Sequence, residues 1–288
     1  AVQDEVTINI LSNLQAMLLY GGRGMDARFA KYYSSKHGLD CYVKVTEADE
    51  SNNRWNIADN TRARQLAEEA MALCPENPLE YSVLGWVYHH AYMLGNTTAP
   101  RETFEKSLHL VQKALAMDDS NSMAHSLLGV LASRQGNHAK AIAEGQRAMA
   151  LNPGNVFRLL NLASTLTNAG RPEDAIPVFQ QAIRLPLFGP SSLYREYGRA
   201  LRNTGRFEEA VSAYQKALQI APENVTAHVG LTATYGLMGR AWEARAEAAQ
   251  VLRSNPTFSL DYSTKTGAAT NQAATNGVVD ALRLAGLK

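Results

Sequence analysis

The sequence predicts an all-α protein: a right-handed α-solenoid of about six helix-turn-helix units with a helical cap at each end. Three observations predict it: a glycine that recurs every 34 or 35 residues, an alanine five residues after each glycine, and a proline near the end of each repeat. These residues are Gly136, Gly170, Gly205 and Gly239, then Ala141, Ala175, Ala210 and Ala244, then Pro153, Pro186, Pro222 and Pro256. A unit of this length cannot bury its apolar face alone, so units must stack to share a core.

The third unit shows why each residue type recurs. Leu127 and Leu131 lie at the spacing of a buried helical stripe, and Gly136 ends that helix because only glycine adopts the left-handed cap without steric cost. A second helix follows, and Ala141 is small because the two helices must approach closely there. Pro153 cannot continue the second helix, so the unit closes at this point.

We expect an N-terminal capping helix and linker at 1–38, a repeat array at 39–256, and a C-terminal loop and capping helix at 257–288. The six units lie near 39–77, 78–121, 122–155, 156–190, 191–224 and 225–256. In the first unit the helices are expected between Leu39 and Asn52 and from Ala63 to Leu73. In the second unit the helices are about ten residues further apart than the repeat allows, which predicts a loop near 90–101. Residues 1–20 should form the helix that covers the exposed end of the first unit, because terminal repeats need a cap.

These units resemble the tetratricopeptide repeat family, whose 34-residue helix-turn-helix pattern carries small and aromatic residues at the same offsets. The fifth unit shows the pattern in full: Tyr194, Tyr197, Gly198, Leu201, Gly205, Phe207, Ala210, Tyr214, Ala217 and Pro222. Four regular units in a row make the resemblance specific. It implies a scaffold that binds other molecules and does not transform them.

A closer resemblance is to the repeat array introduced by a TolB-like domain in certain bacterial signalling proteins. It rests on the segments AVQDEVT (1–7), ARQLAEEA (63–70), LGW (84–86), AIAEG (141–145), GRPEDAI (170–176) and ALRLAGL (281–287). In those proteins the array follows a class III adenylate or guanylate cyclase domain, or a winged-helix DNA-binding domain, and neither is in this sequence. Residues 263–279 depart from the family pattern, with Thr, Ala, Gly and Asn in place of a more charged, aromatic stretch, so we expect a less firmly packed cap.

Charge and composition exclude several classes of function. The 288 residues carry a formal net charge of +1, so no overall field selects nucleic acid or an anionic membrane. No apolar run is long enough to span a bilayer, and no signal peptide opens the chain. The first residues have the character of an excised segment. We expect a cytoplasmic location, or a periplasmic one if the parent protein spans a membrane upstream.

Two cysteines, Cys41 and Cys74, lie 33 residues apart in the first unit. They form a disulfide if they face each other across the helix pair. Two buried free thiols are the favoured interpretation, because a core of this size needs no covalent staple.

The sequence contains no motif that indicates catalysis. The segment GRG at 22–24 lacks the strand and the spacing of a phosphate-binding loop. None of the seven histidines pairs with another at metal-ligand spacing within a helix, and His125 and His228 take the position of a packing aromatic. We therefore expect no enzymatic activity, no metal and no cofactor.

The predicted binding residues lie on the first helix of each unit, which lines the concave face of such a solenoid. They are Trp86, His89 and His90; Ser126, Val130, Ser133 and Arg134; Leu160, Ser164, Thr167 and Asn168; and Arg195, Arg199, Arg202 and Asn203.

Arg195, Arg199 and Arg202 share one helix face, where like charges repel by a few tenths of a kcal/mol per pair. Guanidinium groups bind carboxylate and phosphate bidentately, so the stripe indicates an anion site. The alternative is a solvated stripe whose charge is balanced by Glu196, Glu208 and acidic residues on neighbouring units. The pattern lacks the lysine and asparagine clamp of chaperone-binding tetratricopeptide domains, so we do not expect that partner class.

The sequence thus predicts a module that binds a protein or peptide with acidic groups, or another domain of its parent chain, without nucleic acid or membrane insertion. The closer resemblance implies the regulatory region of a bacterial adenylate or guanylate cyclase-like signalling protein. The alternatives are a structural scaffold that holds the parent as a homodimer and the sensor region of a winged-helix transcriptional regulator.

Overall fold

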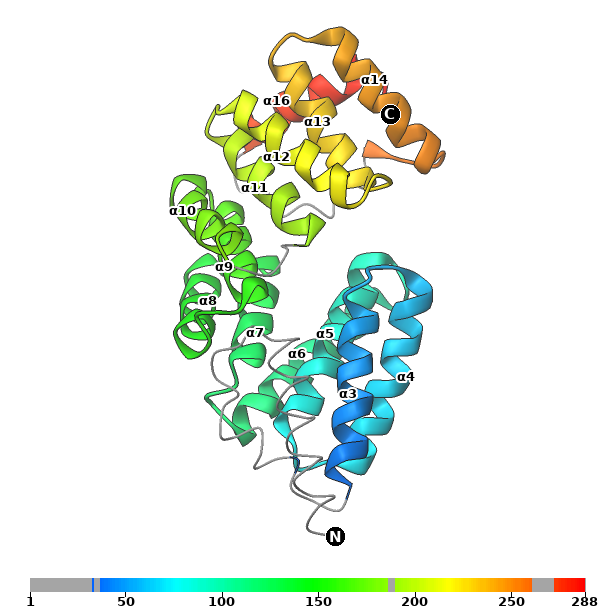
Figure 1. Ribbon diagram of the computed structural model, residues 1–288, viewed down its shortest axis with the longest axis vertical. Coiled ribbons are helices and arrows are strands. Elements are labelled where there is room, and N and C mark those ends of the chain that lie inside the picture. Colours follow the sequence, from blue (N-terminus) through cyan, green and yellow to red (C-terminus); the bar gives the residue numbers. More distant parts are fainter. Residues whose placement is uncertain (1–32, 34–36, 186–189, 261–271, 288) are drawn as a thin grey trace. The chain divides into compact units, whose positions relative to one another are not determined.

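The computed structural model describes residue 33 and residues 37–185, 190–260 and 272–287 (Figure 1). Every regular element in these ranges is a helix, and consecutive helices pack against each other as pairs. The all-α fold class is therefore confirmed. The chain divides into two compact units, which we describe separately: the N-terminal unit, residues 1–131 with 143–158, and the C-terminal unit, residues 132–142 with 159–288.

In the described part of the N-terminal unit, four helices before α7 (Ser122–Arg134) pack in sequence. They are α3 (Gly38–Asn52), α4 (Ile57–Leu73), α5 (Pro78–Leu94) and α6 (Pro100–Met117). Asn56 and Asn77 cap α4 and α5, because their side-chain oxygens accept the backbone N–H groups of Asp59 and Leu79. Fully buried alanines on α4, including Ala63 and Ala67, allow it to lie close to its neighbours. The helices expected in the first unit are confirmed, with α4 starting six residues earlier than Ala63.

The loop expected near 90–101 is present but shorter, at residues 95–99. Helix α5 continues to Leu94 and α6 starts at Pro100, so the surplus residues lengthen both helices. The extension is stable because it adds packing: the ring of Tyr92 lies 5.6 Å from that of Phe104, centroid to centroid. Gly95, with a φ of 70°, then ends α5.

Two further helices connect the units along the chain, α7 (Ser122–Arg134) and α8 (His138–Leu151). The C-terminal unit continues with α9 (Val156–Asn168), α10 (Pro172–Ile183), α11 (Ser191–Asn203), α12 (Phe207–Ile220), α13 (Val225–Leu237), α14 (Ala241–Ser254) and α16 (Gln272–Leu284). From α10 to α14 each helix packs on the next, and α16 covers α13 and α14. Tyr214 of α12 is buried against Gly198 and Gly230, where an added Cβ atom would lie 3.1 Å and 2.3 Å from its ring.

The repeat glycines end the first helices, as predicted. Gly136, Gly170, Gly205 and Gly239 each lie two residues beyond such a helix with φ between 73° and 77°. In each case the next N–H group bonds a carbonyl of the last helical turn, as from Arg206 to Leu201 at 2.9 Å. This pattern is the glycine cap that reverses the chain between paired helices. The helix expected at 1–20 and most of the divergent stretch at 263–279 lie outside the described residues.

Candidate functional site

Three arginines predicted to bind an anion lie on α11, and a carboxylate lies between two of them. The Nη1 atom of Arg195 is 2.9 Å from Oε1 of Glu196. Arg199 donates to Oε2 of Glu196 from Nε at 2.8 Å and lies 2.5 Å from the same oxygen through Nη2. The side chain of Glu196 is 13% exposed, and those of the two arginines are 28% and 29% exposed. Glu196 is therefore held by paired, partly buried guanidinium groups.

Electrostatics links these residues to α7 and α9. Burial alone would raise the pKa of the Glu196 carboxyl, but Arg199 and Arg195, with a smaller effect from Arg134, outweigh it and hold that pKa at about 2. Asn168, the last residue of α9, accepts a hydrogen bond from Nη1 of Arg199 at 2.9 Å. The expected proximity of Arg134 and Asn168 to the α11 arginines is thus present in the C-terminal unit. We refer to Arg134, Arg195, Arg199 and Arg202, with Glu196 and Asn168, as the arginine cluster.

The α11 arginines have different environments, which the sequence pattern could not show. Arg199 uses both sides of its guanidinium group, toward Glu196 and toward Asn168. Arg202 forms no ion pair among the described residues, and its buried Nε atom has no hydrogen-bond partner there. The neighbouring Asn203 is exposed. The expected role of Arg199 as an open ligand donor is therefore revised: it is a tightly bonded group within the fold.

The predicted groove residues of α5 are packed inside the N-terminal unit. Trp86, His89 and His90 are 8%, 4% and 7% exposed. The indole N–H of Trp86 donates to the Met123 carbonyl at 3.4 Å, and Nδ1 of His90 lies 3.2 Å from the Asn52 carbonyl. Burial lowers the pKa of His90 to about 4, so this imidazole is neutral at physiological pH. These three residues form part of the core, and the expectation that they line an open groove is corrected.

Trp55 is an exposed aromatic residue beside this core, and it is not among the residues predicted from the sequence. The centroid of its ring lies 4.3 Å from that of the His90 ring, and Trp55 is 49% exposed. Its φ of 58° is unusual for a bulky residue. Trp55 precedes α4 in the turn after α3, and no repeat position marks that turn, so periodicity could not have identified it.

The remaining predicted positions differ in their exposure to solvent. Ser126, Ser133, Leu160 and Thr167 are buried, and the Thr167 hydroxyl donates to the Ala163 carbonyl within its own helix at 2.9 Å. Val130 and Ser164 are partly exposed. Of the predicted set outside α11, Arg134 and Asn168 therefore combine partial exposure with polar groups near the α11 arginines.

Two histidines that the sequence placed at equivalent repeat positions make the same contacts. The Nδ1 atom of His125 lies 2.6 Å from Oε2 of Glu144, and its Nε2 atom lies 2.6 Å from the Asp119 carbonyl oxygen. His228 lies 2.6 Å from Glu247 and 3.0 Å from the Pro222 carbonyl through the same two atoms. Each imidazole connects the two helices of its repeat to the preceding turn, so it is a structural polar contact rather than a packing aromatic alone.

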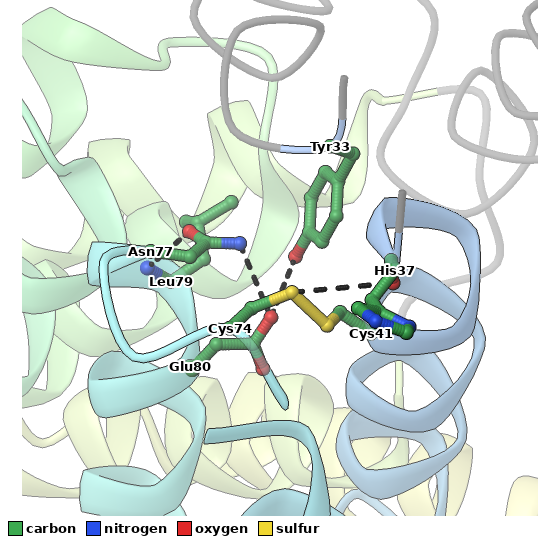
Figure 2. Close-up of a disulfide and its surroundings, with 7 residues drawn as sticks. All are labelled: Tyr33, His37, Cys41, Cys74, Asn77, Leu79 and Glu80. Carbon is green, nitrogen blue, oxygen red and sulfur yellow. Dashed lines mark hydrogen bonds between the residues drawn. A yellow bond between two sulfur atoms is a disulfide. The ribbon is translucent and has the colours of Figure 1, made fainter. Parts of the chain in front are cut away.

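The first repeat is closed by a disulfide between Cys41 and Cys74 (Figure 2). The favoured expectation of two free thiols is wrong. Helix α3 places Cys41 in its first turns beside the C-terminal end of α4, and the two Cα atoms lie 6.3 Å apart, within bonding range.

A buried acid lies beside this disulfide (Figure 2). Glu80 is fully buried, and its Oε1 accepts hydrogen bonds from the Tyr33 hydroxyl at 3.3 Å and from the Asn77 amide at 3.1 Å. Its Oε2 has no hydrogen-bond partner among the described residues. Burial raises the pKa of the Glu80 carboxyl to about 8, so it is mostly protonated at neutral pH.

In the described part of the chain, no group of three or more His, Cys, Asp or Glu residues is arranged to hold a metal ion. No helix in those ranges has both the length and the apolar character needed to cross a bilayer.

Sequence models of the tetratricopeptide repeat match residues 92–156, 160–225 and 201–263. Together these matches cover more than half of the chain, which belongs to the tetratricopeptide repeat family. Proteins built from such repeats generally bind proteins or peptides and are not catalytic. Comparison with curated protein sequences gives no match.

Solved structures share the fold at low sequence identity. A chain of the APC/C hetero-tetramer Cut9–Hcn1 is 13% identical with a TM-score of 0.63, covering 88% of this chain and 51% of that one. The type IV pilus biogenesis factor PilW is 16% identical with a TM-score of 0.53, covering 68% and 90%. The PilF protein of Pseudomonas aeruginosa is 18% identical with a TM-score of 0.50, covering 76% and 97%. At these identities the similarity establishes the fold alone.

Proposed function

We propose that this chain is a non-catalytic module that binds an acidic protein or peptide segment through the arginine cluster. The observation that carries the proposal is the concentration of guanidinium groups near one carboxylate. Arg195 and Arg199 both pair with Glu196, Arg134 also acts on it electrostatically, and Arg202 forms no ion pair among the described residues. Partly buried like charges repel one another, and an anion from a partner would relieve that repulsion. Bonds from guanidinium to carboxylate are charge-assisted and geometrically specific.

A peptide ligand suits this cluster better than nucleic acid does. Binding to nucleic acid rests on many phosphate contacts and a broad basic surface, and the whole chain carries a net charge of +1. A single cluster within one repeat neighbourhood matches a short acidic segment.

The test is a fluorescence anisotropy titration of the full chain with two labelled peptides of equal length. One carries glutamate at alternate positions, and the other carries glutamine at the same positions. We expect binding of the glutamate peptide only, with an affinity that falls as salt is raised, because the exposed part of the interaction is screened. Equal binding of the two peptides, or no binding of either at low salt, contradicts the proposal.

The resemblance to arrays behind TolB-like domains suggests a cellular context. We infer that the array regulates an output domain of a signalling protein, a nucleotide cyclase or a winged-helix regulator, by contacting one of its states more favourably than another. Deletion of residues 39–288 from the parent protein should then change regulation and leave the output activity itself intact. The isolated chain should neither bind nor cyclise ATP or GTP, which a nucleotide-binding assay checks.

A structural scaffold is the rival function, and light scattering of the isolated chain separates the two. A stable homodimer favours the scaffold, and a monomer favours an open binding surface.

The Cys41–Cys74 disulfide supports an oxidising compartment, such as the periplasm, over the cytoplasm expected from the sequence.

A further inference from the structure

The arginines of α11 divide into bonded and available groups. Arg199 is fixed on two sides, by the Glu196 carboxylate and by the side-chain oxygen of Asn168. Arg195 forms an ion pair with Glu196 in which Nη1 lies 2.9 Å from Oε1, and its side chain is 28% exposed. Arg199 therefore has a second partner, Asn168, beyond the carboxylate that it shares with Arg195.

Arg202 is the arginine of α11 without an anionic partner. It enters no ion pair within the described ranges, and its Nε–H group is buried without an acceptor. It lies close to the buried Tyr214 hydroxyl: burial raises the pKa of that hydroxyl, and Arg202 is the charge that most opposes the rise. The Arg202 residue is partly exposed, so a ligand carboxylate that approaches it would meet a positive charge that no carboxylate of the described residues neutralises.

The spacing of Arg195 and Arg202 sets the spacing of their ligands. Seven residues apart, they share one face of α11, and their Cα atoms are separated by about 10.5 Å along the helix axis. In an extended polyproline-type peptide, residues three apart also share one face and are separated by about 9.3 Å. Two carboxylates in an acid-x-x-acid segment therefore match the two arginines, with Arg199 and its internal carboxylate between them.

We propose that the ligand is an extended peptide with two acidic residues three positions apart, one bound by Arg195 and the other by Arg202. Arg199 is a positioning residue: its bonds to Glu196 and Asn168 fix the side chains between the two contacts. This assignment rests on the proposed function, since it names the ligand of the same cluster. The bonds of Glu196 to Arg195 and Arg199 provide the chain's own example of how a carboxylate is held here.

The experiment uses the full chain and labelled peptides with a common proline-rich host sequence. The host carries the core EPPE, EPE, EPPQ or QPPQ. We expect EPPE to bind at least about tenfold more tightly than EPPQ, the size of one hydrogen bond to a charged group. In Arg202→Gln this advantage should disappear, so that EPPE binds the variant no more tightly than EPPQ binds the unaltered chain.

Two further variants separate ligand contact from general effects. Arg206→Gln removes an exposed guanidinium that already pairs with Glu209 at 2.6 Å, so it should leave EPPE binding within about twofold. Arg199→Lys keeps the positive charge but loses the planar guanidinium group that bonds Glu196 and Asn168 at the same time. Because the side chains between the two contacts are then no longer fixed, the preference for EPPE over EPE should disappear. A purely structural effect would weaken both peptides equally and would exclude the positioning role. Circular dichroism must show unchanged helix content in each variant.

The outcomes distinguish the two levels of the proposal. If none of the acidic peptides binds the unaltered chain at low salt, the proposed function itself fails. If they bind but EPPE has no advantage, or Arg202→Gln keeps that advantage, the function stands and the assignment of Arg195 and Arg202 is overturned.

Discussion

Reduction of the Cys41–Cys74 disulfide should destabilise the first repeat. The bond joins the start of α3 to the C-terminal end of α4 across a sequence separation of 33 residues. Opening it releases a loop of that length in the unfolded chain. In the chain-entropy model, closing such a loop contributes about 4 kcal/mol, and measured disulfides typically contribute about 2–4 kcal/mol. The packed helix pair remains, so we expect weakening rather than complete unfolding.

The effect should be local, because repeats in a solenoid contact only their neighbours. Trp55 and Trp86 belong to the N-terminal unit, and Trp242 lies on α14 in the C-terminal unit. Trp242 is 79% exposed, so Trp242→Phe should leave stability nearly unchanged. Tryptophan fluorescence of that variant then reports unfolding of the N-terminal unit alone.

Urea unfolding of the Trp242→Phe protein, with and without dithiothreitol, gives the measurement. We expect the reductant to lower the free energy of unfolding of the N-terminal unit by about 2–4 kcal/mol. The additional substitution of both Cys41 and Cys74 by alanine is the control, and it should make unfolding insensitive to dithiothreitol. Coincident curves for the oxidised and reduced proteins would refute the reasoning.

Three other predictions concern stability. Ala210→Leu should lower the free energy of unfolding by roughly 1–3 kcal/mol, because it overpacks a fully buried contact. Ser212→Leu, on the exposed face of the same helix, should change it by no more than about 0.5 kcal/mol. Equal effects of the two substitutions in urea unfolding would show that the repeat register is wrong. The pKa of Glu80, about 8 when folded against an ordinary 4.5, means that the folded state retains a proton that the unfolded chain releases. Stability from this group is therefore complete below about pH 4.5 and is lost as pH rises toward 8, at roughly 1.4 kcal/mol per pKa unit, and Glu80→Gln should flatten the profile. His228→Phe should lower the free energy of unfolding by roughly 1–3 kcal/mol, because it leaves the Glu247 carboxylate without its imidazole partner. A double-mutant cycle with Glu247→Gln should show coupling between the two residues, and additive effects would argue against the contact.

The repeat made most of the fold predictable from the sequence. A glycine cap and a small contact residue are local requirements, and Gly205 and Ala210 meet them at the predicted places. The loop predicted near 90–101 is shorter in the structure, at residues 95–99, because periodicity fixes the total length of a unit and does not say whether extra residues enter a helix or a loop. The packing of Tyr92 on Phe104 decides that question, and it is a tertiary contact.

The candidate site was predictable in outline only. Helical spacing alone placed Arg195, Arg199 and Arg202 on one face. Their different partners depend on rotamers and on Asn168 from another repeat, which spacing does not determine. The same limit explains Trp86, which occupies a predicted groove position yet is buried.

The disulfide could not be decided from the sequence because cysteine spacing does not reveal which helix faces meet. Two cysteines 33 residues apart are compatible with facing or opposed positions. The start of α3 at Gly38 brings Cys41 opposite Cys74, and the Cα separation of 6.3 Å then permits the bond.

The most direct test of the central claim is to observe the arginine side chains during ligand binding. Nuclear magnetic resonance of the ¹⁵N-labelled full chain resolves arginine Nε–Hε signals, which single arginine-to-lysine variants can assign. On addition of the EPPE peptide, we predict saturable shifts of the Arg195 and Arg202 signals and an unchanged Arg206 signal. Unchanged α11 signals at saturating peptide, or shifts spread evenly over exposed arginines, would contradict the claim that this cluster receives the ligand's carboxylates.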